Sequence, residues 1–225
     1  FLASRVLVRQ SLESLIKIVS VAPAGPFKIK PPWVNTLSFM MNIDDQGVVG
    51  KLLDWIVEND LEVIIRFEPD RISTERRIII FKQVFNFYAD KGIWLSSNKF
   101  STKDLARFGS SGDILDFLLD KLNDSASAAI VKLNSVRVLK HFELNDFSQY
   151  RELVRSSLIG LLSTDQLDHY GIQTTIGALT EMGITDKDTL DFIVAKFRRH
   201  KNQYIRSGLY KFLHHSEYLD DYLDI

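Results

Sequence analysis

The most concentrated charge in this sequence is a basic cluster near its carboxyl end, interleaved with Tyr204 and Tyr210. The cluster comprises Lys196, Arg198, Arg199, His200, Lys201, Arg206 and Lys211. Basic side chains contact phosphates, and helical repeats can present them in a groove, so one hypothesis is nucleic-acid binding. The alternative is a solvated turn between helices, which we favour because charge runs are usually exposed faces. Nearby carboxylates would partly neutralise it, namely Glu217, Asp220, Asp221 and Asp224.

Other residues that could do chemistry lack the spacing that the chemistry needs. The stretch 47–52, Gly-Val-Val-Gly-Lys-Leu, has the wrong glycine spacing for a phosphate-binding P-loop and lacks its hydroxyl. No G-x-G-x-x-G fingerprint for a dinucleotide occurs. The five histidines form no metal-binding pair one helical turn apart, and the chain has no cysteine. Serines such as Ser110 and Ser111 lack a G-x-S-x-G elbow.

Carboxylates stand close together at three places, where helix caps or solvated ends are expected. These are Asp44-Asp45, Asp186-Lys187-Asp188 and Asp220-Asp221. An acid–base pair needs two carboxylates in one cleft with environments that split their pKa values, which this pattern does not indicate. We therefore predict a protein that is not an enzyme, with no cofactor and no metal.

Composition narrows the class of protein further. The 225 residues carry a net charge of −1, so we expect neither nucleic acid nor a membrane surface as a partner. Apolar runs are far shorter than a membrane span and no signal-peptide pattern occurs, which favours the cytoplasm. The chain opens at Phe1 with residues typical of a helix interior, so we expect a piece of a longer polypeptide.

The distribution of helix-breaking residues predicts an all-α fold. The chain has 11 glycines and 5 prolines, and all the prolines lie in the first third. We expect a helix over 4–21, a proline-rich extended connector over 22–33, and a helix capped by Asp44 or Asp45 that ends near Asn59. Another helix should run from Ser73 to a stop at Lys91-Gly92, and Ser101 to Asp104 resembles a capping box.

Beyond the tetrapeptide Gly109-Ser110-Ser111-Gly112, which we interpret as a flexible boundary, the pattern becomes regular. It predicts three consecutive helix pairs, with Asp124-Ser125 as a cap and Met182-Gly183 as a stop. The second helix of each pair opens similarly, at separations of 41 and 33 residues: Val131-Lys132, Ile172-Gln173 and Ile205-Arg206. Such periods are typical of HEAT-like α-solenoids, although an ordinary helical bundle is the alternative. We thus expect an irregular helical connector over 1–109 and HEAT-like repeats over 110–225.

Motifs within residues 33–108 resemble a known family. They are Leu52 to Asp60 with its tryptophan, the turn Glu68-Pro69-Asp70-Arg71, and Phe87 to Trp94. This pattern is similar to the region that follows the NACHT-type ATPase module in large bacterial STAND proteins. The resemblance implies that Trp55 fills a gap between helices and that Pro69 ends one helix before Asp70 or Ser73 begins the next.

In that family a C-terminal helical-repeat region senses a ligand, often a phage protein, and triggers oligomerisation. The family's nucleotide motifs are absent from this chain, so the resemblance implies a connector and sensor that recognises protein and relays a signal. The partner would be a protein ligand or a neighbouring domain. We expect it on the face formed by the second helices, around Arg137, Gln173 and Arg206. One alternative is a stand-alone helical-repeat protein that binds nucleic acid through the cluster from Arg198 and Arg199 through Tyr204 to Arg206. A helical enzyme is the other, and it would require a deep pocket with convergent polar side chains.

Overall fold

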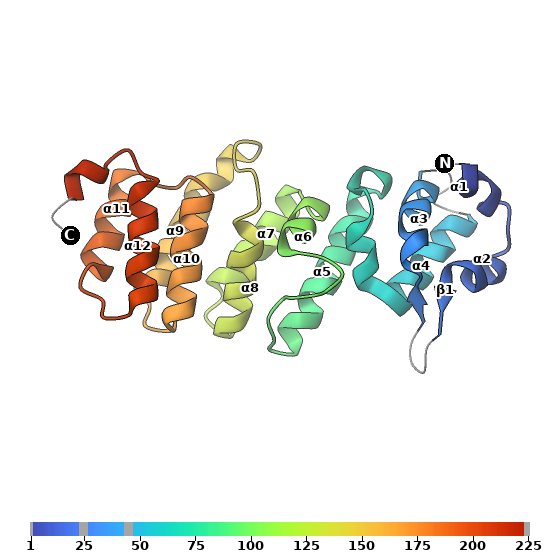
Figure 1. Cartoon of the computed structure of the whole chain (residues 1–225), viewed down its shortest axis with the longest axis horizontal. Coiled ribbons are helices and arrows are strands. Elements are labelled where there is room, and N and C mark those ends of the chain that lie inside the picture. Colours follow the sequence, from blue (N-terminus) through green and yellow to red (C-terminus); the bar gives the residue numbers. More distant parts are fainter. Residues whose placement is uncertain (1, 23–26, 43–46, 223–225) are drawn as a thin grey trace. The chain divides into compact units, whose positions relative to one another are not determined.

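The fold is all-α, as the sequence predicts. The computed structural model describes residues 2–22, 27–42 and 47–222, which form twelve α-helices, five short 3₁₀-helices and one two-stranded sheet (Figure 1). Helices dominate because glycine and proline, the residues that interrupt them, are scarce. None of the described helices combines the length and apolar character that crossing a membrane requires.

The chain divides into two compact units. The N-terminal unit comprises Phe1–Asp90 and Leu95–Ser111, and the C-terminal unit comprises Lys91–Trp94 and Gly112–Ile225. The division between Ser111 and Gly112 thus falls two residues after the boundary expected at 109, and Lys91–Trp94 group with the later helices. Gly109 is buried, and a Cβ atom there would overlap ring atoms of Phe81. Packing therefore holds Gly109 in place. We had expected Gly109 to belong to a flexible boundary, so that expectation was wrong for this residue.

The N-terminal unit begins with two helices, α1 (Leu2–Leu7) and α2 (Leu12–Val19), where one helix was expected over 4–21. The prediction was wrong because Ser11 has extended backbone, with φ −68° and ψ 154°. Its side chain accepts the Ser14 backbone N–H at 3.3 Å and so starts a new helix. The apolar stripe continues across this break, which conceals it in the sequence.

A short hairpin and a further helix follow. Strand β1 (Ser20–Val21) pairs antiparallel with β2 (Lys28–Ile29), with Ser20 opposite Ile29. The chain then forms η1 (Pro31–Trp33) and α3 (Val34–Met40), a helix that the sequence pattern did not predict. The expected caps Asp44 and Asp45 lie outside the described residues, as do Pro23 and Pro26.

The rest of the N-terminal unit consists of α4 (Val48–Asp60), η2 (Leu61–Arg66), η3 (Pro69–Arg71), α5 (Thr74–Asp90) and α6 (Thr102–Phe108). Trp55 does not fill a gap between helices, because it is half-buried and packs edge-to-face on Phe27 with ring centres 5.6 Å apart. The stop after α5 is confirmed, since Gly92 has φ 60°. The capping box is also confirmed, with Ser101 and Asp104 each accepting the backbone N–H of the other.

The C-terminal unit contains three helix pairs, α7 (Gly112–Asn123) with α8 (Ala129–Leu139), α9 (Arg151–Ser163) with α10 (His169–Glu181), and α11 (Lys187–Phe197) with α12 (Gln203–His214). Short helices η4 (Ser148–Tyr150) and η5 (Leu219–Tyr222) precede α9 and follow α12. The helices of each pair pack together, α8 packs on α10, and α10 packs on α12 (Figure 1). The second helices therefore form a continuous layer.

Two expected helix ends in this unit have different outcomes. Gly183 ends α10 with φ 64°, which confirms the stop at Met182-Gly183. Asp124 does not cap α8, which begins at Ala129 after an extended Ala128. Instead, its carboxylate accepts the Ala126 backbone N–H at 2.9 Å and the Ser127 hydroxyl at 3.0 Å. Asp124 therefore stabilises the turn between α7 and α8.

Candidate functional site

A stripe of small and polar residues runs along the outer face of α10. This stripe is separate from the apolar stripe that packs in the core. Residues three or four positions apart lie on one face of a helix. Such a face contains Tyr170, Gln173, Thr174, Gly177, Thr180 and Glu181. All of these are exposed or half-exposed, whereas Thr175, Ile176, Ala178 and Leu179 are buried. The face of α10 turned away from the core is therefore accessible.

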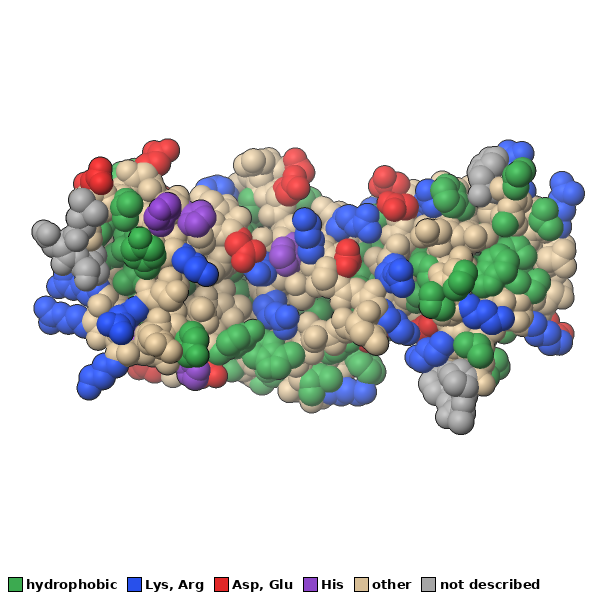
Figure 2. All heavy atoms as spheres, viewed as in Figure 1, with side chains coloured by type: hydrophobic (Ala, Val, Ile, Leu, Met, Phe, Trp, Pro, Cys, Tyr) green, Lys and Arg blue, Asp and Glu red, His purple; other side chains and the backbone are tan. Residues whose placement is uncertain are grey.

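This stripe forms the centre of a groove with a volume of about 500 Å³. Helix α8 contributes Arg137 and Lys140 to the groove, and α12 contributes Gly208, Lys211 and His215. Lys140 Nζ pairs with Glu181 Oε1 across α8 and α10 at 3.0 Å. In Figure 2, this face of the C-terminal helices shows blue and green side chains on a largely tan surface, with few red ones. We call this feature the second-helix groove.

Exposed aromatic rings border the second-helix groove at its α8 and α10 side. Trp94 and Tyr170 pack edge-to-face with ring centres 5.2 Å apart, although they are 38% and 46% exposed. The Arg137 guanidinium lies over the Trp94 ring at 5.3 Å. Asn134 donates from Nδ2 to the Ile93 carbonyl at 2.9 Å, which holds the segment that contains Trp94 against α8. Arg137 and Trp94 are thereby positioned by contacts within this unit.

The structure brings together two of the three residues expected on this face. Arg137 and Gln173 line the second-helix groove, but Arg206 does not. Arg206 is five residues before Lys211, which is about 140° around an α-helix, so the two side chains leave α12 in different directions. Arg206 lines a separate pocket of about 220 Å³ with Arg198, Tyr210 and apolar residues of α12. Arg206 therefore lies outside the second-helix groove, and its role in binding a partner stays a prediction from the sequence.

The remaining predicted site residues do not gather at one place. Tyr204 precedes Gly208 by four residues and Lys211 by seven, which places it on the groove side of α12, and its ring stacks near His169 at 6.4 Å. Arg199 is exposed in the turn after α11. Asp221, expected to neutralise the basic cluster, pairs instead with Lys187 at 3.0 Å. Asp224 lies outside the described residues.

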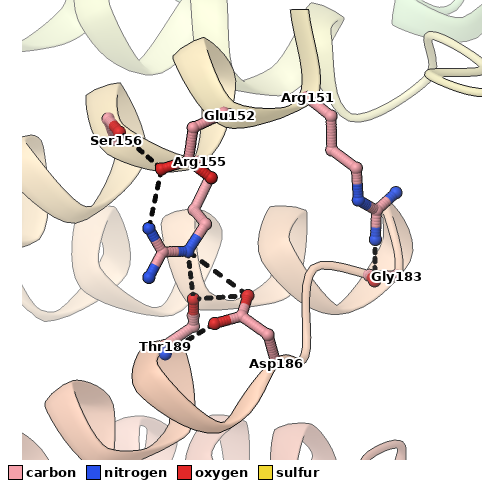
Figure 3. Close-up of polar contacts among 7 residues, drawn as sticks. All are labelled: Arg151, Glu152, Arg155, Ser156, Gly183, Asp186 and Thr189. Carbon is pink, nitrogen blue, oxygen red and sulfur yellow. Dashed lines mark hydrogen bonds and ion pairs between the residues drawn. The ribbon is translucent and has the colours of Figure 1, made fainter. Parts of the chain in front are cut away.

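In the layer formed by the first helices of the pairs, polar side chains of α9 hydrogen-bond to the segment that begins α11 (Figure 3). Arg155 of α9 donates from Nε to Thr189 Oγ1 at 2.8 Å and to Asp186 Oδ2 at 3.3 Å, at the start of α11. It also donates from Nη1 to Glu152 at 2.9 Å, and Arg151 donates to the Gly183 carbonyl at 2.5 Å. These arginines therefore connect successive helix pairs.

Asp186 is the N-cap of α11 and the centre of this network. Its carboxylate accepts the Thr189 backbone N–H at 3.0 Å and the Thr189 hydroxyl at 2.8 Å. Burial alone would raise the pKa of Asp186, but the hydrogen bonds from Thr189 and the charge of Arg155 outweigh it, so its pKa lies below 3.8. Asp186 thus acts as a charged cap and not as a proton donor.

A second polar cavity, of about 330 Å³, lies in the N-terminal unit beside Asp60, Glu62 and Tyr88. The Asp60 side chain is 2% exposed, accepts the Ile29 backbone N–H at 2.8 Å, and pairs with Lys99 and Lys28. Glu62 accepts the Tyr88 hydroxyl at 2.5 Å. Burial, this hydrogen bond and the charge of Glu62 raise the pKa of Tyr88. Each of these groups has a partner in the chain, so we interpret the cluster as structural.

Neither place resembles a metal centre. Within residues 2–22, 27–42 and 47–222, no group of three His, Cys, Asp or Glu side chains is placed to hold a metal ion. Comparison with protein-family models, curated proteins and solved structures gives no significant match to this chain. The resemblance to STAND proteins therefore remains a prediction from the sequence motifs.

Sequence reasoning missed Trp94, Tyr170 and Lys140 as site residues. Tyr170 and Lys140 could have been found, because they continue the stripes that contain Gln173 and Arg137 at helical spacing. Trp94 could not, because it lies in an irregular segment that reaches α8 and α10 through tertiary contacts. Its position depends on the fold and leaves no local pattern in the sequence.

Proposed function

We propose that the C-terminal unit is a HEAT-like helical repeat that binds a partner protein through the second-helix groove. The observation that carries this proposal is the exposed Trp94–Tyr170 pair with Arg137 stacked on it, at the edge of a groove of about 500 Å³. Tryptophan, tyrosine and arginine are the residue types enriched at energetic hot spots of protein interfaces. The successive packing of α8, α10 and α12 supports the repeat assignment.

The function proposed is recognition and signal relay, without catalysis. Catalysis by general acid–base chemistry needs a titratable group that is both accessible and activated by its surroundings. Glu181, the carboxylate among the described groove residues, is held in an ion pair with Lys140 at 3.0 Å. The groove otherwise offers amide, hydroxyl and cationic groups, which favour binding. We place this activity in the cytoplasm, as part of a larger STAND-type protein in phage defence.

The proposal for the groove can be tested with peptides selected on the full chain from a random-peptide display library. Tyr170→Ala and Trp94→Ala should each weaken the selected peptides by about tenfold or more, as truncation of a hot spot does. Tyr210→Ala is the matched control, because Tyr210 is also exposed but lines the other pocket, and it should change affinity by less than about twofold. If the affinity of the selected peptides changed in neither Tyr170→Ala nor Trp94→Ala, the proposal would be contradicted.

The STAND assignment has a separate test in the reading frame upstream of the codon for Phe1. A Walker A motif with its acidic partner is expected there, because the ATPase module precedes the resembling region in that family. A frame that begins close to Phe1 without such a module contradicts the assignment and leaves the groove proposal intact.

A second candidate function is nucleic-acid binding by the basic cluster. It is favoured by one observation: within the described part of the chain, Arg198, Arg199, Lys201 and Arg206 form no ion pair with a carboxylate. Binding of a fluorescent single-stranded RNA should then weaken steeply with salt and be lost in Arg198→Ala/Arg206→Ala. No binding at about 50 mM salt would remove this candidate.

A further inference from the structure

We infer that the second-helix groove takes an acidic, extended segment of the partner protein, an inference that rests on the proposed function and specifies the ligand. Three cationic side chains line the groove, Arg137, Lys140 and Lys211, against one carboxylate, Glu181. With His215 neutral, the groove lining therefore carries a net charge of +2, whereas the whole chain carries −1. The positive charge is thus a property of this groove and not of the protein as a whole.

The three cationic side chains lie in different parts of the groove, because Arg137 and Lys140 come from α8 and Lys211 comes from α12. Lys140 is already paired with Glu181 on the α8 and α10 side. The Arg137 guanidinium lies over the Trp94 ring, so its positive charge stands beside the exposed aromatic pair. Lys211 is exposed on α12 and forms no ion pair with a described acidic residue. Acidic side chains on a bound segment would complement Arg137 and Lys211 together.

The floor of the groove leaves room for a backbone to come close. Gly177 and Gly208 have no side chains, and a Cβ atom added at Gly177 would have no neighbour within 4 Å. Glycine in a helix interior costs about 1 kcal/mol relative to alanine, and the packing of this chain does not require it at Gly177. Gln173 and Thr174 flank the floor with amide and hydroxyl groups that can hydrogen-bond to a peptide backbone. The groove therefore suits an extended chain.

The position of Glu181 favours an acidic peptide over a nucleic acid. Every unit of a nucleic-acid backbone carries a phosphate, and a phosphate placed near the Glu181 carboxylate would be repelled by it. A peptide can place a neutral residue there and acidic residues beside Arg137 and Lys211. The aromatic pair Trp94 and Tyr170 would pack on an apolar side chain of the same segment.

The test uses the composition of the library peptides whose binding is lost in Tyr170→Ala. We expect these peptides to be enriched in Asp and Glu and to weaken by about tenfold between about 50 and about 500 mM salt. Lys211→Glu should weaken them by about tenfold, and exchanging the peptide's acidic residues for lysine should restore binding to that variant. Lys103→Glu is the matched control, because it makes the same charge change on the exposed face of α6, where a glutamate suits the first helical turn.

Space in the groove is tested independently of charge. Gly177→Leu should abolish binding by filling the floor, whereas Gly160→Leu, at an exposed glycine of α9 that also lacks neighbours within 4 Å, should leave it unchanged. Tyr170-dependent peptides without acidic enrichment would overturn the acidic preference and leave the proposed function standing. Peptides insensitive to Tyr170→Ala would overturn both. A third result would also overturn the inference: RNA displaces the acidic peptides, and neither Lys103→Glu nor Lys211→Glu affects their binding. That result would favour nucleic-acid binding by the basic cluster.

Discussion

The two units of this protein use charged side chains in opposite ways. In the N-terminal unit, the Asp60 carboxylate is 2% exposed and is satisfied by the Ile29 N–H and by Lys28 and Lys99. In the C-terminal unit, Arg137 and Lys211 line an open groove beside exposed aromatic rings. A buried charge needs partners from its own chain, whereas a charge that lines a groove stays accessible to a ligand. The first arrangement therefore stabilises a fold, and the second is suited to recognition.

The same contrast holds between the two layers of the C-terminal unit. Arg151 and Arg155 donate their hydrogen bonds to the next helix pair, as Figure 3 shows. Between the second helices, Lys140 pairs with Glu181, but the groove along α10 leaves Thr174, Gly177 and Thr180 open, with Arg137 and Lys211 beside them. The hydrogen bonds between α9 and the start of α11 thus fix how these pairs stack. The side chains that line the groove on α8, α10 and α12 therefore remain accessible to a ligand. Substitutions should separate stability from recognition along this division.

The largest effect is expected at Asp60. Asp60→Ala removes the acceptor of a buried N–H and the partner of two lysines, so it should lower the free energy of unfolding by about 3 kcal/mol. Hydrogen exchange should locate the loss in β2, α4 and the segment around Lys99. Asp54→Ala is the control on the same helix, because Asp54 is 65% exposed and pairs with Arg76 at 3.4 Å, and it should cost less than about 0.5 kcal/mol. Equal losses in the two variants would contradict the structural role of Asp60.

A smaller effect is expected at Arg155. Arg155→Ala removes contacts to Glu152, Asp186 and Thr189 and should lower the free energy of unfolding by about 1 to 2 kcal/mol in urea denaturation. Arg155→Lys should recover part of this, since an ammonium cannot reproduce the planar donor set. Peptide binding in the groove should not change. If Arg155→Ala weakened binding as much as Tyr170→Ala, the two layers would not be separate in function.

Features that depend on local chemistry could be predicted from the sequence. Helix caps and stops at Ser101, Gly92, Asp186 and Gly183 depend on local chemistry, and the structure confirms the sequence expectation at each. The break at Ser11 was missed because the apolar stripe passes through it in phase. Short helices such as α3 are fixed by packing and leave a weak periodic signal.

The repeat pattern predicted the groove only in part, because equivalent sequence positions have different surroundings. Lys132 is 6% exposed, Gln173 is half-buried in the groove, and Arg206 is exposed outside it. Helix α8 is covered by α7, by α10 and by the segment that contains Trp94, so nearly all of its faces are buried. Helix α12 contacts α10, α11 and η5, and Arg206 lies on a side of the helix that they leave exposed. The neighbours of a helix decide which face is open, and a single sequence does not list them.

A smaller effect on stability is expected at two glycines, Gly177 in the groove and Gly160 in α9. Gly177→Ala and Gly160→Ala should each raise the free energy of unfolding by about 0.5 to 1 kcal/mol, because alanine favours the helix and neither Cβ meets a neighbour within 4 Å. Gly177→Ala alone should weaken the selected peptides, since only Gly177 lines the groove. The measurements are urea denaturation and fluorescence anisotropy. A gain in stability at Gly177 with unchanged affinity would show that the groove floor does not contact the ligand.

The smallest effect concerns the charge of Asp186. Asp186→Asn keeps a good N-cap but removes the charge that faces Arg155, so it should cost about 0.5 kcal/mol near pH 7, a value reduced by the 47% exposure of the side chain. Because the folded state lowers the pKa of Asp186 below 3.8, the ionised carboxylate stabilises the native state above that pH. This contribution is lost as the pH falls through the lowered pKa, so the difference between the two proteins in urea should shrink there. A difference that stays constant from about pH 7 to about pH 2 would mean that the hydrogen bonds of the cap, and not its charge, connect α9 to α11.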